Sequence, residues 1–209
     1  MKKTLWMIII ALAILVGIIP ITYLVNGVNE GYLQLKGPEI LRSKTWWFFL
    51  YIHAISGGIA ILIGWIQFSK KILQNRPKLH RFIGKSYFFS AIICSISGFY
   101  IGFYATGGMV AAAGFITVAC IYFYTTLQGY LTIRKGQIAE HQNMMTYSYA
   151  ACLAAVSLRL STPIAYILGF EYVSSYTFIA WSAWIPNLMI AYWINKNRSE
   201  YSLEILKSK

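Results

Sequence analysis

The chain has 209 residues, of which 58% are hydrophobic and 11% are charged, and its formal net charge is +12. A soluble domain carries about 25% charged residues, so this composition, with a mean hydropathy of +0.57, excludes an ordinary soluble globular protein. A strongly positive chain can bind nucleic acid, but here the basic residues cluster beside apolar runs. We therefore expect membrane lipids with anionic headgroups as partners, and no nucleic acid.

Six apolar runs follow one another along the chain, and each is long enough to span hydrocarbon. They cover residues 5–25, 45–68, 82–104, 110–133, 144–169 and 177–194. Lipid cannot satisfy exposed backbone groups, so these runs are expected to be helices. The prediction is an all-α membrane bundle of six transmembrane helices in one domain, residues 1–209. Its parts are a first helix and outer loop (1–44), a core of five helices (45–195) and a tail (196–209).

The basic residues predict how this bundle is oriented. If the N-terminus is cytoplasmic, all but four of the 18 Lys and Arg residues fall on the cytoplasmic side. The exceptions are Lys36, Arg42 and Lys44 on the outer side, and Arg159 within a helix. The positive-inside rule therefore predicts that both termini are cytoplasmic, in a multi-pass protein of the bacterial plasma membrane. The first run lacks a small-x-small cleavage site, so we expect it to be retained.

Turns and small residues predict how the helices connect and pack. In the outer segment 26–44, Pro38 can start a short helix. Gly107-Gly108 predicts a tight turn between the third and fourth helices. Small residues recur every four positions at Ser56, Ala60 and Gly64 on the second helix and at Gly98 and Gly102 on the third. Such faces let helices approach closely, either within one chain or in a homo-oligomer.

Three polar residues are expected in the outer half of the membrane. His53 shares the small-residue face of the second helix and lies about 12 Å below its outer end. Arg159 lies about 24 Å from the inner end of the fifth helix, and Asn187 in the sixth is at similar depth. Polar groups inside a membrane are costly, which makes each a functional candidate. Together they predict an outer polar pocket for a lipid or small anion, in a non-enzymatic carrier or assembly factor. Alternatively, Arg159 hydrogen-bonds backbone carbonyls or snorkels outward, and His53 bonds to a neighbouring helix.

Two other histidines predict a cytoplasmic-side site. His80 precedes the third helix and His141 the fifth, so both lie at matched depth on parallel, diagonally placed helices. A helix N-terminus disfavours imidazolium and leaves a neutral ring that can bind metal. Such a pair can hold the iron of a b-type haem, which makes a redox or electron-transfer protein the leading hypothesis. The alternatives are that His80 simply faces lipid headgroups, or that a histidine-bound metal serves a membrane enzyme.

Other enzyme templates are absent from the sequence. The chain contains no Asp, which excludes a Ser-His-Asp triad, and it has no phosphate-binding or dinucleotide fingerprint. Cys94, Cys120 and Cys152 show no paired spacing and are interpreted as packing residues. The sequence therefore does not define a catalytic residue.

Several segments in fixed order carry a family resemblance. They are His53, Ser56-Gly57-Gly58, Gly64-Trp65-Ile66-Gln67-Phe68, Arg76-Pro77-Lys78-Leu79-His80-Arg81, Gly84-Lys85-Ser86-Tyr87, His141-Gln142-Asn143-Met144-Met145, Tyr147-Ser148-Tyr149, Leu158-Arg159-Leu160 and Trp184-Ile185-Pro186-Asn187. Over residues 45–195 the chain resembles the bacterial membrane proteins grouped as domain of unknown function 2306. That resemblance implies the fold and these residues, but no reaction.

A weaker similarity is to the four-helix cores of cytochrome b561. It implies that His80 and His141 form one haem-ligand pair. His53 would need a partner on the fourth helix, which has no histidine.

Overall fold

The computed structural model describes residues 3–21, 33 and 36–207 of the chain. Within these residues the regular secondary structure is entirely helical. The predicted all-α class is therefore confirmed.

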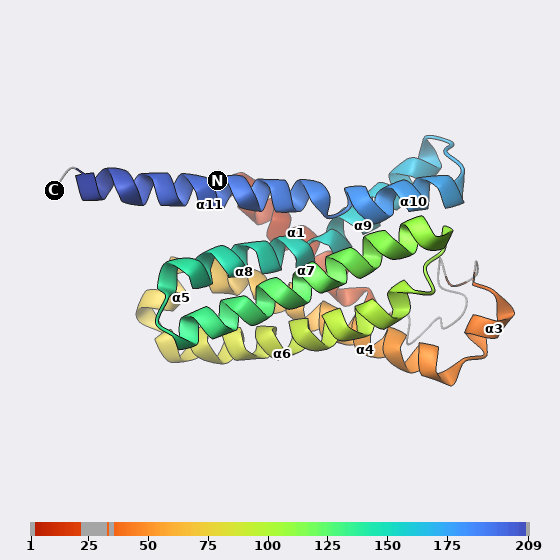
Figure 1. The fold of residues 1–209 in the computed structure, drawn as a ribbon, viewed down its shortest axis with the longest axis horizontal. Helices are drawn as coiled ribbons and strands as arrows, with labels where there is room; N and C mark the ends of the chain where they lie inside the picture. Colours follow the sequence, from red (N-terminus) through yellow and green to blue (C-terminus); the bar gives the residue numbers. More distant parts are fainter. Residues whose placement is uncertain (1–2, 22–32, 34–35, 208–209) are drawn as a thin grey trace.

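Four long helical segments form the core (Figure 1), and each is long and apolar enough to cross a membrane. They are α4 (Lys44–Gly64) with the short 3-10 helix η3 (Trp65–Phe68), α6 (Pro77–Gly102), α7 (Gly108–Arg134), and α8 (Ile138–Cys152) continued by α9 (Ala154–Ile167). α4 packs beside α6, α6 beside α7, and α7 beside α8. This arrangement places α6 and α8 diagonally across the bundle. The second to fifth predicted spans match these four segments.

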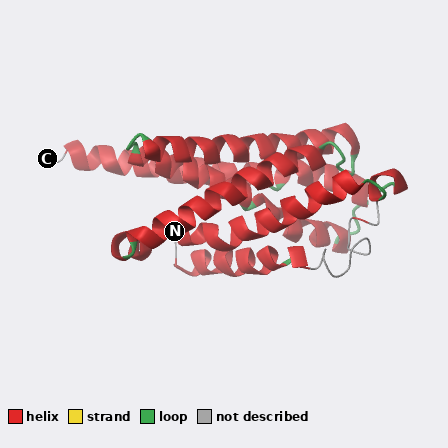
Figure 2. Ribbon diagram, turned by 90° about the horizontal axis from the view of Figure 1, so that it is seen from below, coloured by secondary structure: helices red, strands yellow, loops and turns green. Residues whose placement is uncertain are grey.

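The other helices of the described chain surround or extend this core. They are α1 (Lys3–Ile18), α3 (Pro38–Leu41), α5 (Lys70–Asn75), α10 (Tyr172–Ser182) and α11 (Ile185–Lys207). α3 and α5 lie at opposite ends of the bundle, called here the α3 end and the α5 end (Figure 1). α1 starts at the α5 end, where the Trp6 and Phe68 rings meet at 5.8 Å. α11 projects past the bundle at that same end (Figures 1 and 2).

The first and sixth predicted spans differ from the structure. α1 ends at Ile18, and its apolar part, Trp6–Ile18, is shorter than the four core spans. Residues 22–25 of the predicted first span, and residues 26–32, 34 and 35 of the predicted outer segment, lie outside the described residues. The chain thus shows four candidate spans within its described part, rather than a clear six.

The prediction of one continuous helix over residues 177–194 is wrong, because the helix is interrupted between α10 and α11. Pro186 accounts for the break: it has no N–H to donate to the Ser182 carbonyl, and its ring would collide with that group in a continued helix. α11 continues through most of the predicted tail, as far as Lys207.

The predicted turns and packing faces agree with the structure. Gly107 and Gly108 join α6 to α7 with φ of 99° and 73°, which glycine adopts without strain. α3 begins at Pro38. A Cβ on Gly102 would lie 3.0 Å from Ile116 of α7, and one on Gly64 would lie 2.5 Å from the Tyr149 ring. The small-residue faces therefore serve packing within this chain.

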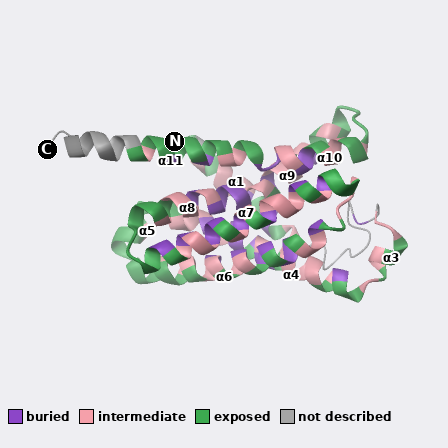
Figure 3. Cartoon of the chain, viewed as in Figure 1, coloured by how far each residue is buried: buried purple, intermediate pink, exposed green. Residues whose placement is uncertain are grey.

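Burial is concentrated where the four core helices face one another (Figure 3). Tyr87 and Tyr149, only 1% and 3% exposed, fill the interior toward the α5 end. The interior toward the α3 end is lined by smaller residues, and a cavity lies there.

Candidate functional site

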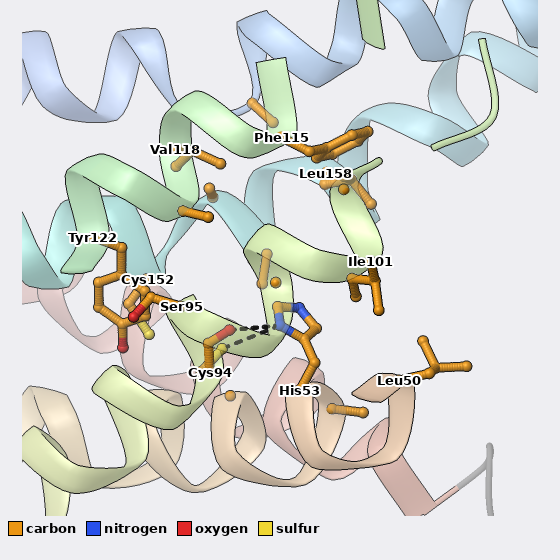
Figure 4. A pocket seen from close by; sticks show the side chains of 18 of the residues that line it. Leu50, His53, Cys94, Ser95, Ile101, Phe115, Val118, Tyr122, Cys152 and Leu158 are labelled. Carbon is orange, nitrogen blue, oxygen red and sulfur yellow. Dashed lines mark hydrogen bonds between the residues drawn. The ribbon is translucent and has the colours of Figure 1, made fainter. Parts of the chain in front are cut away.

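A partly open cavity of about 320 Å³ lies between α4, α6, α7 and α8–α9, with residues of α1 and α10 also in its wall (Figure 4). Much of its wall consists of small side chains from the four core segments, including Ala54, Gly57, Gly98, Ala119, Ala151 and Ala155. Apolar cavities of this size with a few polar groups are typical small-molecule sites. Its polar groups therefore indicate what it can bind.

His53 on α4 is the first of these groups, and its tautomer follows from one hydrogen bond. Its Nδ1 lies 2.9 Å from the carbonyl oxygen of Cys94 on α6, and 3.5 Å from the Cys94 thiol (Figure 4). A carbonyl only accepts, so Nδ1 carries the proton and the neutral ring keeps a lone pair on Nε2. The ring fits because Gly98 has no side chain: a Cβ there would lie 3.0 Å from it.

Two cationic side chains line the same cavity. Arg159 on α9 lies close enough to His53 for its charge to act on the imidazole. Lys36, between the described Leu33 and α3, donates through Nζ to the backbone oxygen of Tyr104. Burial lowers the pKa of Lys36 from 10.5 to about 8. No acidic side chain stands among the described residues that line the cavity.

Asn187 does not line the cavity. Its side chain instead forms hydrogen bonds at two places where the helices are interrupted. Its Nδ2 donates to the carbonyls of Ala150 (3.4 Å) and Ala183 (3.1 Å), and to the Ser157 hydroxyl at 3.1 Å. These carbonyls precede the α8–α9 and α10–α11 breaks, where regular helical bonding is interrupted. The structure therefore brings His53 and Arg159 together and leaves Asn187 in a packing position.

His80 and His141 lie at the α5 end on the diagonal helices α6 and α8. The His141 Nδ1 is 2.7 Å from the Gly129 carbonyl oxygen, so it donates a proton there and leaves Nε2 with a lone pair. The His80 Nδ1 is buried and has no hydrogen-bond partner among the described residues. The two imidazoles lie near enough for their charges to interact. Across the described chain, no three His, Cys, Asp or Glu side chains gather as a metal site.

A hydroxyl cluster in the bundle centre was missed by the sequence analysis. The Tyr87 hydroxyl lies 2.9 Å from that of Ser148, which in turn lies 2.7 Å from that of Thr126. Tyr87 follows His80, and Ser148 follows His141, by seven residues, or about two turns, which puts each pair on one helix face. This shared spacing of seven residues is the sequence pattern from which the hydroxyl cluster could have been predicted. Lys36 and Tyr122, which also line the cavity, carried no comparable signal.

Long apolar helices packed around a mostly apolar cavity with a few polar groups define the class: a multi-pass helical membrane protein. The model of the family described as "Predicted membrane protein (DUF2306)" matches residues 50–194, more than half of the chain. The chain therefore belongs to this family, domain of unknown function 2306. The matched segment contains every site residue predicted from the sequence. No curated protein and no solved structure matches the chain.

Proposed function

We propose that this protein binds an amphiphile with an acidic head in the His53–Arg159 cavity, and acts as a membrane carrier or binding protein. The observation that supports this is the meeting of a histidine and an arginine, from helices far apart in sequence, in one apolar cavity. Placing an arginine within a membrane segment is costly, and such residues usually serve a substrate or ligand.

The polar groups favour an anionic or hydrogen-bond-accepting head. The guanidinium of an arginine such as Arg159 carries several N–H groups in a planar fork, whose geometry matches a carboxylate or phosphate. Lys36 adds positive charge at the same cavity. The apolar remainder of the wall suits a hydrocarbon body, so a fatty acid or acidic lipid fits both features.

The test compares a medium-chain fatty acid with its uncharged alcohol, using native mass spectrometry of the purified protein in detergent. Arg159→Gln should weaken binding of the acid by at least about tenfold, because a charge-assisted hydrogen bond contributes about 1.5–3 kcal/mol. Binding of the alcohol should change little. Arg134→Gln, which removes an exposed arginine from the last turn of α7, is the matched control. If Arg159→Gln binds the acid as the wild type does, the proposal fails.

We propose further that the chain crosses the bacterial plasma membrane six times with both termini in the cytoplasm. The basic residues support this, because most of those in the described chain belong to α5, the start of α6, the α7–α8 turn and α11, at or beyond the α5 end. There they would contact anionic headgroups. Reporter fusions to each terminus, one active only in the cytoplasm and one only outside, check this topology. An outside-active fusion at either end contradicts it.

Haem binding between His80 and His141 is the second candidate, and the bond from His141 to Gly129 favours it. Ligand histidines usually donate their other ring N–H to a carbonyl or carboxylate, as His141 does. The unpartnered His80 Nδ1 is a second polar atom that a bound group could satisfy. The donor atoms therefore fit an iron site, at which a haem would supply one-electron chemistry.

The space between α6 and α8 restricts haem binding more than the donor atoms of His80 and His141 do. The Tyr87–Ser148 hydrogen bond closes α6 against α8 about two turns toward the α3 end. A haem held by His80 and His141 must therefore lie on the α5 side of that bond. An absorption spectrum tests the idea: a Soret band should be lost in His80→Ala and in His141→Ala but kept in His53→Ala. A colourless, folded preparation of the wild type overturns it.

A further inference from the structure

The second ring nitrogen of His53 is a hydrogen-bond acceptor that borders the cavity. Its Nδ1 donates to the Cys94 carbonyl oxygen at 2.9 Å, which leaves the lone pair on Nε2. Nε2 bonds to no described residue and, unlike the Tyr122 hydroxyl, is not enclosed by the described residues. Figure 4 shows the imidazole directed from α4 into the cavity, with Nε2 on the side away from Cys94. A ligand in the cavity can therefore reach this atom.

Nothing beside the ring offers Nε2 a second proton or stabilises one. The described lining residues include no acidic side chain that could pair with an imidazolium. The nearby Arg159 brings positive charge, and like charges repel. Nε2 therefore presents a lone pair to whatever the cavity holds.

A bare carboxylate matches only part of this site. Its oxygens accept hydrogen bonds, so they suit the guanidinium of Arg159, but they cannot bond to the lone pair of His53. When such a head displaces water from the cavity, Nε2 loses a partner and gains none, which costs free energy. A head that carries an O–H group beside its carboxylate satisfies both side chains.

The O–H group must lie close to the carboxylate, because His53 and Arg159 are close enough for their charges to interact. Leu158, the residue before Arg159, lies toward the same end of the cavity as His53 (Figure 4). Cys152 lies toward the other end, seven residues or about 10 Å along a helix from Arg159. A hydroxyl at the far end of a medium-chain ligand is therefore out of reach of Nε2.

We propose that His53 selects acidic amphiphiles that carry a hydroxyl on the first carbons after the acid group, as α- and β-hydroxy fatty acids do. This rests on the proposed function and specifies its ligand class. The carboxylate accepts hydrogen bonds from Arg159, and the hydroxyl donates to Nε2 of His53. A fatty acid without this hydroxyl leaves Nε2 unpaired and binds more weakly.

The experiment lets decanoic acid compete with its α-hydroxy, β-hydroxy and ω-hydroxy derivatives in native mass spectrometry of the purified protein. The wild type should bind the α- or the β-hydroxy acid about fivefold more tightly than decanoic acid, as one added hydrogen bond allows. The ω-hydroxy acid is an isomer of these two with its hydroxyl at the far end. It should bind no more tightly than decanoic acid.

Two variants assign this preference to Nε2. In His53→Asn the amide nitrogen is as many bonds from Cβ as Nδ1 is, so it can still donate to the Cys94 carbonyl, but no atom replaces Nε2. This variant should bind decanoic acid and lose the preference. Ser56→Ala is the matched control, since Ser56 lies one turn along α4, bonds to the Ile52 carbonyl and does not line the cavity. It should keep the preference.

The outcomes separate this inference from the function beneath it. If none of the acids binds the wild type, both are overturned. If decanoic acid binds through Arg159 as tightly as its α- and β-hydroxy derivatives, only the role of His53 is overturned. The same follows if the ω-hydroxy acid gains as much as they do, or if folded His53→Asn keeps the preference. Thermal unfolding shows whether His53→Asn is folded, and binding of decanoic acid shows that its cavity is intact.

Discussion

The two halves of the helical bundle use similar small residues to opposite effect. On α4, Gly64 in the α5-end half admits the rings of Tyr149 and Tyr87, whose atoms lie 2.5–2.9 Å from where its Cβ would be. Gly57, seven residues earlier and on the cavity wall, has only the Cys94 sulfur near its Cβ position, at 3.1 Å. The α5-end half of the bundle is therefore filled by side chains, whereas the α3-end half contains the cavity.

This difference shows that a small-residue face does not by itself define a packed interface. Helices in lipid gain little from the hydrophobic effect between them, so close packing depends on what the facing helix inserts. Tyrosines fill the space at Gly64, whereas Cys94, Ala119 and Ala151 leave space near Gly57. The open half is also where the costly His53 and Arg159 side chains meet.

The largest expected effect comes from adding one methyl group to each half. Gly64→Ala should lower the free energy of unfolding by about 2–3 kcal/mol, because the rigid Tyr149 ring must move. Gly57→Ala should change it by less than about 1 kcal/mol, since one sulfur must shift and the helix gains propensity. Thermal unfolding in detergent measures both variants. Equal losses would show that the α3-end half is as tightly packed as the other.

A larger side chain should sharpen the same comparison. Ala91 of α6 is fully buried outside the cavity, so Ala91→Leu should cost about 1–3 kcal/mol by overpacking. Ala119→Leu instead projects into the cavity and should leave the unfolding temperature nearly unchanged. It should also reduce fatty acid binding at least about tenfold, since the site is occupied. Unfolding curves and native mass spectrometry test the pair, and normal binding by Ala119→Leu contradicts the cavity assignment.

Two tyrosines provide the third comparison. Tyr87→Phe should cost about 1 kcal/mol, because it removes the bond to Ser148. Tyr122→Phe should cost less than about 1 kcal/mol, since its hydroxyl lies beside the Tyr87 hydroxyl and the Cys152 thiol without a well-formed hydrogen bond to a described residue. Unfolding measured side by side under identical conditions checks this. A larger loss in Tyr122→Phe than in Tyr87→Phe would mean that Tyr122 has a structural partner.

The smallest expected effect concerns Lys36 and pH. Its pKa is lowered by burial to about 8, so raising the pH from about 7 to about 9 removes most of its charge. Fatty acid affinity should fall about threefold, in line with a partly exposed charge interaction of less than about 1 kcal/mol. In Lys36→Met the affinity should not vary over this range.

The pH dependence of stability that Lys36 produces has the opposite sign to the pH dependence of binding, so the two effects of this residue can be distinguished. Lys36 has a lower pKa in the folded chain than the 10.5 of a free lysine, so the unfolded chain holds more protons between about pH 8 and 10.5. Its contribution to the free energy of unfolding therefore rises with pH in that window. Weaker binding accompanied by a falling unfolding temperature would point to a different titrating group.

Much of the fold followed from the sequence because it depends on local properties of the chain. The length of an apolar run determines whether a helix can span the membrane, which identified the four core segments. A glycine pair permits the positive φ of the α6–α7 turn, and Pro38 suits the first turn of α3. Helical periodicity also placed His53 on the small-residue face, against Gly98.

Only the tertiary structure determined the features that depend on side chains from different helices. Asn187 was expected in the outer pocket, but it bonds the carbonyls at two helix breaks that no apolar run reveals. The cavity exists because small residues of four segments face one another without a large side chain between them. Whether a hydroxyl such as that of Tyr122 has a partner is likewise a property of its neighbours in space and not of its place in the chain.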